Sequence, residues 1–511
     1  MKILSYKQRL AAGAALLVLG LFLLRPGASR LKSRIIASIS AELGRPVDIS
    51  SVHLRLLPRP GFDLEGLVVY DDPLFGAEPM LRASDVTADL RLTSLIRGRI
   101  EIARLDLTDP SLNLVHREGG SWNLEALLER TAQIPTGPTG NPKSAPRLHF
   151  PYIEGSSGRI NFKSGPEKKP YALINADFSL WQDNENTWSV RLKAQPLRSD
   201  LNLNDVGQVR VSGTWQRAQS FRDTPLEFSV EWIHAQVGQV SKFLTGTDKG
   251  WRGEIQIDVA LTGSPAALNI SSTASVDDFR RYDIPSGRAL RLAAHCDAQY
   301  SSVTHEFQEV LCGAPVGSGL VTFTGDMGLP GSHRYSIALR AENVPANTAL
   351  LLVQRAKKNL PDDVVAEGTL RGALSMQDDG TAGSKPKFEG QGEIADFQIS
   401  SATTKAELGP VSVPFVIVGD SDRGVQASSK SRSGMAVPRG AHLEFGPVAL
   451  NSGRQNGAAA RGWLTRVGYS LVITGDTEIA RTLRLARMVG IPAPMATEYP
   501  PSAPAAVFLR S

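Results

Sequence analysis

The sequence predicts a mainly β protein with a few short helices and one apolar segment near its N-terminus that can enter a membrane. Apolar and polar residues alternate with a period of two through most of the chain, which is the pattern of half-buried strands. In residues 85–92, for example, Val86, Ala88 and Leu90 share one face and charged or hydroxyl residues share the other. The only long uninterrupted apolar run is Leu10–Leu24.

This apolar run predicts a single membrane anchor. Its 15 residues form a helix of about 22 Å, shorter than the roughly 30 Å hydrocarbon core, so a cleaved signal peptide is the alternative. The segment that follows, Arg25–Ser29, is a poor cleavage site, and Lys7, Arg9 and Arg25 can extend the span by snorkelling. We therefore expect retention. Basic residues flank the run on both sides, so charge alone leaves the orientation open.

The charge of the chain excludes one class of partner. The net charge of +5 comes from 56 basic and 51 acidic residues dispersed along the chain. There is no basic stripe with interleaved aromatic residues, so we expect no nucleic-acid partner. A mild attraction to anionic lipid headgroups fits this charge better.

Residues 29–43 predict a short amphipathic helix after the anchor. Ser29 can cap it, and Gly44 with Pro46 ends it. Its apolar stripe either packs on the first strands, which we favour, or lies on the membrane with its basic residues toward headgroups. The stripe consists of Leu31, Ile35, Ile36, Ile39 and Leu43.

Turn residues divide the rest of the chain into regions. Strands are expected over residues 46–114 and a helix over residues 123–133. Residues 134–147, rich in Pro and Gly, predict a linker and a domain boundary. The predicted regions are residues 1–28 (cytoplasmic tip and anchor), 29–133 (first β region), 134–147 (linker) and 148–511 (repeated β body).

The β body contains a weak internal repeat. Each copy is a strand, a short helix, a break and a further strand, and the copies begin at Leu226, Tyr335 and Tyr469. The third copy is expected to lack its following strands. Single apolar faces dominate the repeats, and six residues are candidates to line an apolar groove, although plain core packing explains each as well: Ile255, Ile257, Val259, Leu261, Ile337 and Leu339.

The two cysteines, Cys296 and Cys312, predict a cross-strand disulfide. Their segment reads as two strands about a turn near residues 301–304, which places the thiols nearly opposite each other. Two unpaired core cysteines are the alternative.

No residue pattern predicts an enzyme, a metal site or a cofactor. The eight histidines show no pair at metal-ligand spacing, and His295 beside Cys296 points to the other face of its strand. The glycine-rich residues 313–319 lack the lysine of a phosphate loop, and no nucleophile or zinc-protease motif occurs. A hydrolase would need a nucleophile and a base brought together only by folding.

Residues 44–128 resemble the N-terminal region of the AsmA family of bacterial envelope proteins. The matching stretches are GRPVDISSVHLRLLPRPGFDLEGLVVYDDPLF and LRASDVTADLRLTSLIRGRIEIARLDLTDPSLNLVHREGGSWNLEALL. The most specific elements are Leu57-Pro58 with Pro60, Asp72-Pro73 before Phe75, Leu95 with Gly98, Asp109-Pro110, and Gly120 with Trp122, Asn123 and Leu124. The later strands look like the weakly related β repeats of the family.

The resemblance implies a single-pass inner-membrane protein with a cytoplasmic N-terminus and a periplasmic body. It also implies an elongated, curled antiparallel β-sheet, a groove or open barrel related to bridge-like lipid transfer proteins. Periodicity alone favours a closed sandwich instead, because a sheet with one apolar face either packs on a second sheet or curls around an acyl chain.

The function expected from this reading is non-enzymatic. The chain would bind or transfer phospholipid or another envelope lipid, or support outer-membrane assembly, through its apolar groove. The alternative is an anchored scaffold that recruits other envelope proteins through exposed β-edges.

Overall fold

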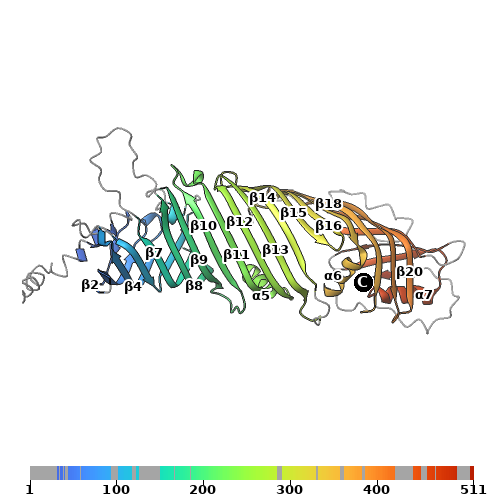
Figure 1. Ribbon diagram of the computed structural model, residues 1–511. Helices are drawn as coiled ribbons and strands as arrows, with labels where there is room; N and C mark the ends of the chain where they lie inside the picture. The colour runs from blue at the N-terminus through green and yellow to red at the C-terminus, as the bar shows by residue number, and fades with distance from the viewer. Residues whose placement is uncertain are drawn as a thin grey trace, which may run out of the picture. The chain divides into compact units, whose positions relative to one another are not determined.

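The computed structural model describes residues 32–491 and 507–510, with gaps (Figure 1). The predicted anchor Leu10–Leu24 and the linker at residues 134–147 lie outside the described residues. Among the helices that are described, none is long and apolar enough to cross a membrane. The gaps are residues 34, 38, 41–43, 58, 94–101, 118–121, 126–149, 166, 185, 285–289, 330–331, 357–361, 382–385, 420–440, 451–456 and 466–467.

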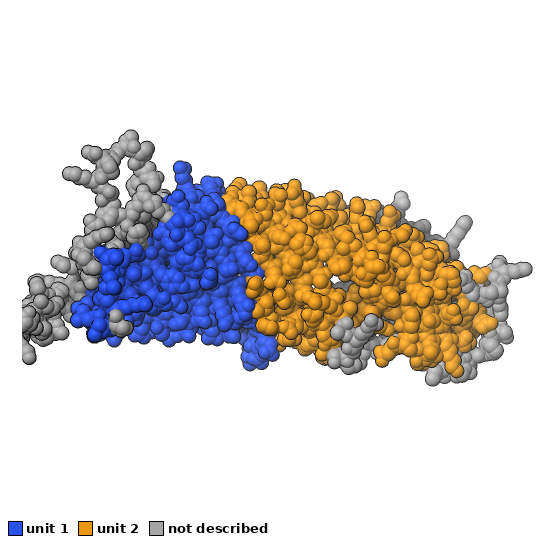
Figure 2. Space-filling view, in the orientation of Figure 1, with its two compact units in different colours: residues 1–230 blue, residues 231–511 orange. Residues whose placement is uncertain are grey.

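The chain divides into two compact units, Met1–Val230 and Glu231–Ser511 (Figure 2). Both units consist of β-sheet with few helices, so the mainly β prediction is confirmed. The predicted domain boundary at residues 134–147 stays a prediction.

Unit 1 is built on a mixed sheet. The strand β3 pairs antiparallel with β1, β2 and β4, and β4 pairs with β5 and β6. From β7 to β10 each strand pairs antiparallel with the next. The elements are β1 (Val47–Asp48), β2 (Ser51–Arg55), β3 (Gly61–Val69), the 3-10 helix η1 (Pro73–Phe75), β4 (Leu81–Leu90), β5 (Ile102–Thr108), β6 (Ser111–His116), β7 (Tyr152–Ser164), β8 (Glu167–Asn184), β9 (Thr187–Arg198), β10 (Gln208–Gln216) and η2 (Phe221–Asp223).

The prediction of a purely antiparallel sheet is wrong at one place in unit 1. Strands β5 and β6 both run parallel to β7, with Leu105 opposite Ile153 and Leu112 opposite Ile160. A parallel pair needs a crossover of a dozen or more residues, and the chain between β6 and β7 is long enough to supply one.

The first strands of unit 1 enclose a buried core. Phe62, Leu64 and Val86 are at most 5% exposed and belong to one apolar cluster. Residues 32–40 are helical where they are described, and Ile35, Ile36 and Ile39 pack against this cluster. The predicted packing of this helix on the first strands is therefore confirmed for these three residues; Leu31 and Leu43 lie outside the described residues. The helix predicted at residues 123–133 begins at Asn123 and is described only to residue 125.

Unit 2 is an antiparallel meander in which every strand from β12 to β24 pairs with the next. The strand β11 (Leu226–Gln236) spans the division between the units. The strands are β12 (Trp251–Ser264), β13 (Ala267–Arg281), β14 (Leu292–Ser301), β15 (Glu306–Val316), β16 (Gly319–Gly328), β17 (Arg334–Pro345), β18 (Val365–Asp379), β19 (Lys387–Ser401), β20 (Ala406–Val418), β21 (His442–Ala449), β22 (Ala459–Leu464), β23 (Tyr469–Thr474) and β24 (Val507–Arg510).

Three helices follow strands in the way that the repeat predicts. They are α5 (Val237–Thr245) after β11, α6 (Ala346–Ala356) after β17 and α7 (Ile479–Met488) after β23. Alternate strands of a meander point the same way, so α6 and α7 both leave the sheet at the same strand ends (Figure 1). The expectation that no strand follows the third copy is wrong, because β24 pairs with β23.

The packed core of unit 2 lies toward its later strands. Met488 of α7 is 1% exposed and packs with Ala366 of β18 and Ile399 of β19, while Leu350 of α6 borders the same cluster. A second cluster joins Ala460 and Ile473 on β22 and β23.

Candidate functional site

The six predicted groove residues lie on β12 and β17, and the strand register places them on one face of unit 2. Residues opposite each other in neighbouring strands share a face. One row of such partners runs without interruption from Val259 to Leu339, through four intervening strands. Its members are Val259, Ser272, Cys296, Cys312, Phe323 and Leu339.

The neighbouring rows extend this apolar face. Ile255 lies opposite Val276 and Leu261 opposite Ile270, while Ile337 on β17 pairs with Met376 on β18. We call this surface, carried by β12 to β17, the apolar face. The residues on it that sequence reasoning did not name are Leu268, Ile270, Ala274, Val276, Leu292, Ala294, Ala298, Val321, Phe323 and Ala341.

The two faces of these strands differ in both chemistry and exposure. Along β14, Ala294 and Cys296 are half-buried, whereas the alternating His295 and Asp297 are exposed. Along β12, Ile257 is half-buried, whereas Glu254, Gln256 and Ala260, which point to the opposite face, are exposed. The period-two pattern of the sequence therefore separates an apolar face from a solvated polar one.

Most of the apolar face lies outside the buried cores, although Val310 of β15 and Val344 of β17 are buried. Among the described residues, the buried apolar clusters contain no member from β12 to β17. A second sheet packed against this face would bury it, as the cores of sandwiches are buried. The closed sandwich favoured by periodicity therefore does not fit the described residues of these strands, where no second sheet buries the apolar face.

Irregularities in the pairing bend these strands. The register shifts at Gly253 in β12, at Glu309 in β15 and at Asn343 in β17, and the last two residues have positive φ values of 52°. An extra residue in one strand of a pair bends that strand and increases its twist. The helix α6 contacts β17 and β18 and also reaches β13. Unit 2 thus has a bent sheet with a helix bridging strands well separated in its order.

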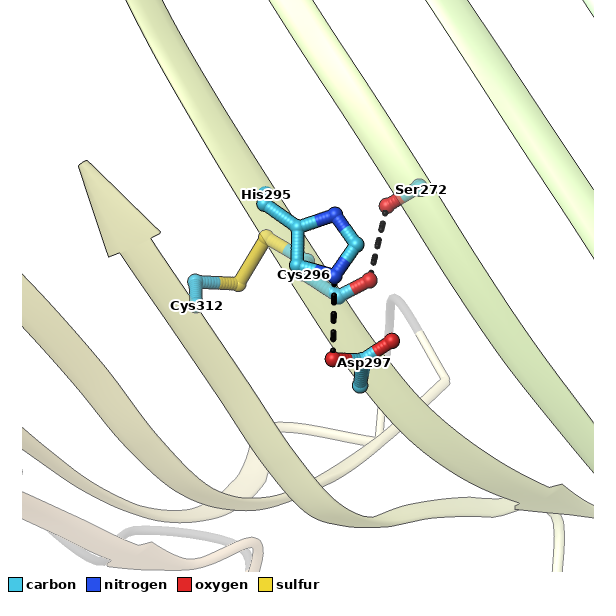
Figure 3. The surroundings of a disulfide bond; sticks show 5 residues. All are labelled: Ser272, His295, Cys296, Asp297 and Cys312. Atoms are coloured by element: carbon cyan, nitrogen blue, oxygen red, sulfur yellow. Dashed lines mark hydrogen bonds and ion pairs between the residues drawn. A yellow bond between two sulfur atoms is a disulfide. The ribbon is translucent and has the colours of Figure 1, made fainter.

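The predicted disulfide lies on the apolar face. Cys296 of β14 is directly opposite Cys312 of β15, and their sulfurs are bonded at 2.07 Å (Figure 3). The turn between the two strands falls at residues 302–305, as the sequence predicts. The His295 ring is hydrogen-bonded to Asp297 at 3.1 Å on the other face, so it is a strand residue and not part of a thiol site.

Charged side chains lie at the strand ends and pair there. Near the start of β12, Asp248 accepts hydrogen bonds from the Arg252 guanidinium and, at 2.7 Å, from the Gly250 backbone N–H. The hydrogen bond from Arg252 is the main cause that lowers the pKa of Asp248, against the opposing effect of burial. At the end of β13, a two-pronged hydrogen bond to Asp283 raises the pKa of the Arg281 guanidinium.

The described residues contain no cluster of metal-ligating side chains. Within them there is no group of three or more His, Cys, Asp or Glu that could hold a metal ion. The arrangement presents a half-buried apolar surface with paired charges beside the start of β12 and the end of β13, a chemistry suited to apolar ligands.

Comparison with known proteins bears on the N-terminal third of the chain. Residues 10–175 match the model of the AsmA family, which confirms the resemblance drawn from residues 44–128. A comparison with curated proteins gives no significant match, and neither does a comparison with solved structures.

Proposed function

Because residues 10–175 of this chain are an AsmA-family region, we propose that the protein is an inner-membrane-anchored periplasmic protein that binds envelope lipids on its apolar face. Leu10–Leu24 would be the anchor, with the N-terminus in the cytoplasm. The protein acts without catalysis, as a carrier or conduit for lipids or as a factor in outer-membrane assembly.

The observation that carries this proposal is the half-buried apolar row from Val259 to Leu339. Six strands, with five spacings of about 4.8 Å, give it a width of roughly 24 Å. Burying an acyl chain against such a surface is worth about 0.8 kcal/mol for each methylene removed from water. A lipid tail therefore fits this face, while its headgroup stays at the charged rim or in water.

The test compares two neighbouring residues of β17 that point to opposite faces. Ile337→Asp places a charge on the apolar face, and Ser336→Asp places the same charge on the exposed polar face. The full chain is purified in mild detergent, and co-purifying lipids are quantified by mass spectrometry. We expect I337D to lose most of the bound lipid and S336D to retain it, because only the first charge would have to be buried under an acyl chain.

Two results would refute lipid binding. The first is a parent protein that is purified without lipid. The second is equal lipid content in I337D and S336D when circular dichroism shows both to be folded.

The scaffold function is the second candidate, and one observation favours it. The edge strand β2 pairs with β3 on one side only among the described residues, so its other side can accept a strand from a partner protein. Crosslinking in cells from positions on β2 that gave discrete protein partners, with no lipid in the purified chain, would favour this alternative.

A further inference from the structure

Four large apolar side chains at one end of unit 1 are exposed to solvent. Leu54, Leu56, Leu57 and Leu92 are 57%, 68%, 82% and 58% exposed, and we call them the leucine tip. Three lie at the end of β2 and in the turn into β3, and Leu92 follows β4. The Leu90 backbone N–H donates to the Pro60 carbonyl at 2.9 Å, so the turn and the end of β4 are adjacent.

The composition of this turn is unusual for a β-hairpin. Such turns are normally made of Gly, Asn, Asp and Ser, which solvate the reversing backbone. Clustered exposed apolar residues instead mark a surface that contacts a partner or a membrane.

The helix at residues 32–40 runs away from the leucine tip, so that its start lies closer to the tip than its end. Past its C-terminal end, Arg45 pairs with Asp71 at 3.6 Å and Asp72 at 3.1 Å, just beyond the far end of β3. At its start, the Lys32 ammonium donates to the Ser50 carbonyl at 3.2 Å, and Ser50 lies beside Glu65 near the middle of β3. The chain reverses at Gly44, and β1 and β2 then run back toward the leucine tip, antiparallel to the helix.

The connection between this helix and the predicted anchor is short. Only seven residues, 25–31, separate Leu24 from Lys32. Fully extended, they reach at most about 25 Å. With Leu10–Leu24 in a bilayer, the start of the helix lies within that distance of the membrane surface. Five residues of strand, about 17 Å, separate Ser50 from Arg55 at the tip end of β2, so this connection is short enough for the leucine tip to reach the membrane.

We infer that the leucine tip inserts into the interfacial layer of the bilayer that holds the anchor. The inference rests on the proposed anchoring of the chain, and it adds a second membrane contact that orients unit 1. Leucine side chains partition into the boundary between headgroups and acyl chains. Beside them, Arg59 is 71% exposed and its ion pair with Asp89 is 3.5 Å long, so its guanidinium can also reach lipid phosphates.

The experiment places a fluorescent probe on the tip of the full chain. Leu57→Cys is labelled without reduction, so that the Cys296–Cys312 bond stays intact, with a dye that reports the polarity around it. The protein is incorporated into nanodiscs of phosphatidylethanolamine and phosphatidylglycerol that carry a quencher in their acyl chains. We expect the emission to move to shorter wavelength and to lose most of its intensity to the lipid quencher.

The matched control is Leu74→Cys, at a leucine that is 64% exposed in η1, beyond the opposite end of β3. Its dye should stay unquenched. A second experiment labels Leu92→Cys with and without the L56S/L57S substitutions: quenching at position 92 should be strong in the parent and lost in the double variant. Both double-variant positions are exposed, so folding is not at risk.

Equal quenching at positions 57 and 74, or none at either, would overturn the inference. Co-elution of the chain with nanodiscs reports the anchor independently, and lipid content after detergent extraction reports the apolar face. Quenching at position 57 without bound lipid would thus refute the lipid-binding proposal alone, and bound lipid without quenching would refute the membrane contact of the leucine tip alone.

Discussion

The first strands of unit 1 and the strands β12 to β17 of unit 2 have the same period-two pattern, but their apolar residues are buried to different degrees. In β3, Leu64 is 2% exposed and belongs to a cluster against which Ile35, Ile36 and Ile39 pack. In β12, Ile257 points to an equally apolar face yet is only half-buried. Alternation therefore determines which residues share a face, and a covering element determines whether that face becomes a core.

The largest expected effect comes from shortening one apolar side chain in each region. Leu64→Ala should cost about 2 to 5 kcal/mol, because it leaves a cavity in a packed core. Ile257→Ala should cost roughly 1 kcal/mol or less, because the side chain already contacts water in the ligand-free protein. Hydrogen exchange monitored by mass spectrometry, with peptides from β3 and from β12, measures the free energy of local opening in each region.

The reverse ranking would break the comparison. If Ile257→Ala destabilised β12 as strongly as Leu64→Ala destabilises β3, the apolar face of β12 would be a packed core, and no surface would be left for a lipid.

The second prediction concerns the disulfide that joins β14 and β15, two strands that contribute no residue to the buried apolar clusters of the described chain. The disulfide closes a loop with a sequence separation of 16, for which loop entropy gives a stabilisation of about 3 kcal/mol. C296A/C312A should therefore lower the protection of β14 and β15 from hydrogen exchange by about that amount and leave β3 and β4 unchanged. Unchanged exchange in both strands would mean that backbone pairing, of β14 with β13 and of β15 with β16, is sufficient without the disulfide.

Much of the apolar face is predictable from local sequence, and the parts that are not have identifiable causes. The alternation around Ile257 and Ile337 predicts their orientation, and the spacing of Cys296 and Cys312 predicts their pairing. The connecting residue Ser272 is missed because small hydroxyl residues dilute the period-two signal of β13. That Val259 and Leu339 lie in one row depends on the register of five successive pairings, and no single-strand pattern contains that information.

The overall topology is likewise predictable from local sequence in some parts and not in others. The helix at residues 32–40 and its packing follow from a local apolar stripe, which the sequence displays directly. The parallel pairing of β5 with β7 does not follow from local sequence, because it depends on where a long connecting segment returns the chain. Whether a face is covered is likewise a tertiary property, so neither the core of unit 1 nor the open face of unit 2 follows from periodicity.

The smallest expected effect tests whether backbone conformation, and not side-chain packing, limits the local stability of β16 and β17. Gly325 has a φ of 141°, and a Cβ there would lie 2.1 Å from the Ser336 carbonyl oxygen, so Gly325→Ala must displace the neighbouring strand. A strained backbone position costs about 1 to 3 kcal/mol. Gly313 in β15 is the matched control, because its φ is not positive and the nearest atom to an added Cβ is the Leu320 side chain at 3.8 Å. Gly313→Ala should leave exchange in β15 and β16 unchanged, whereas Gly325→Ala should accelerate it in β16 and β17. Equal effects at the two glycines would mean that the sheet adjusts to an added methyl group at either position. The contrast with the packed strands around Leu64 would then extend from side chains to the backbone.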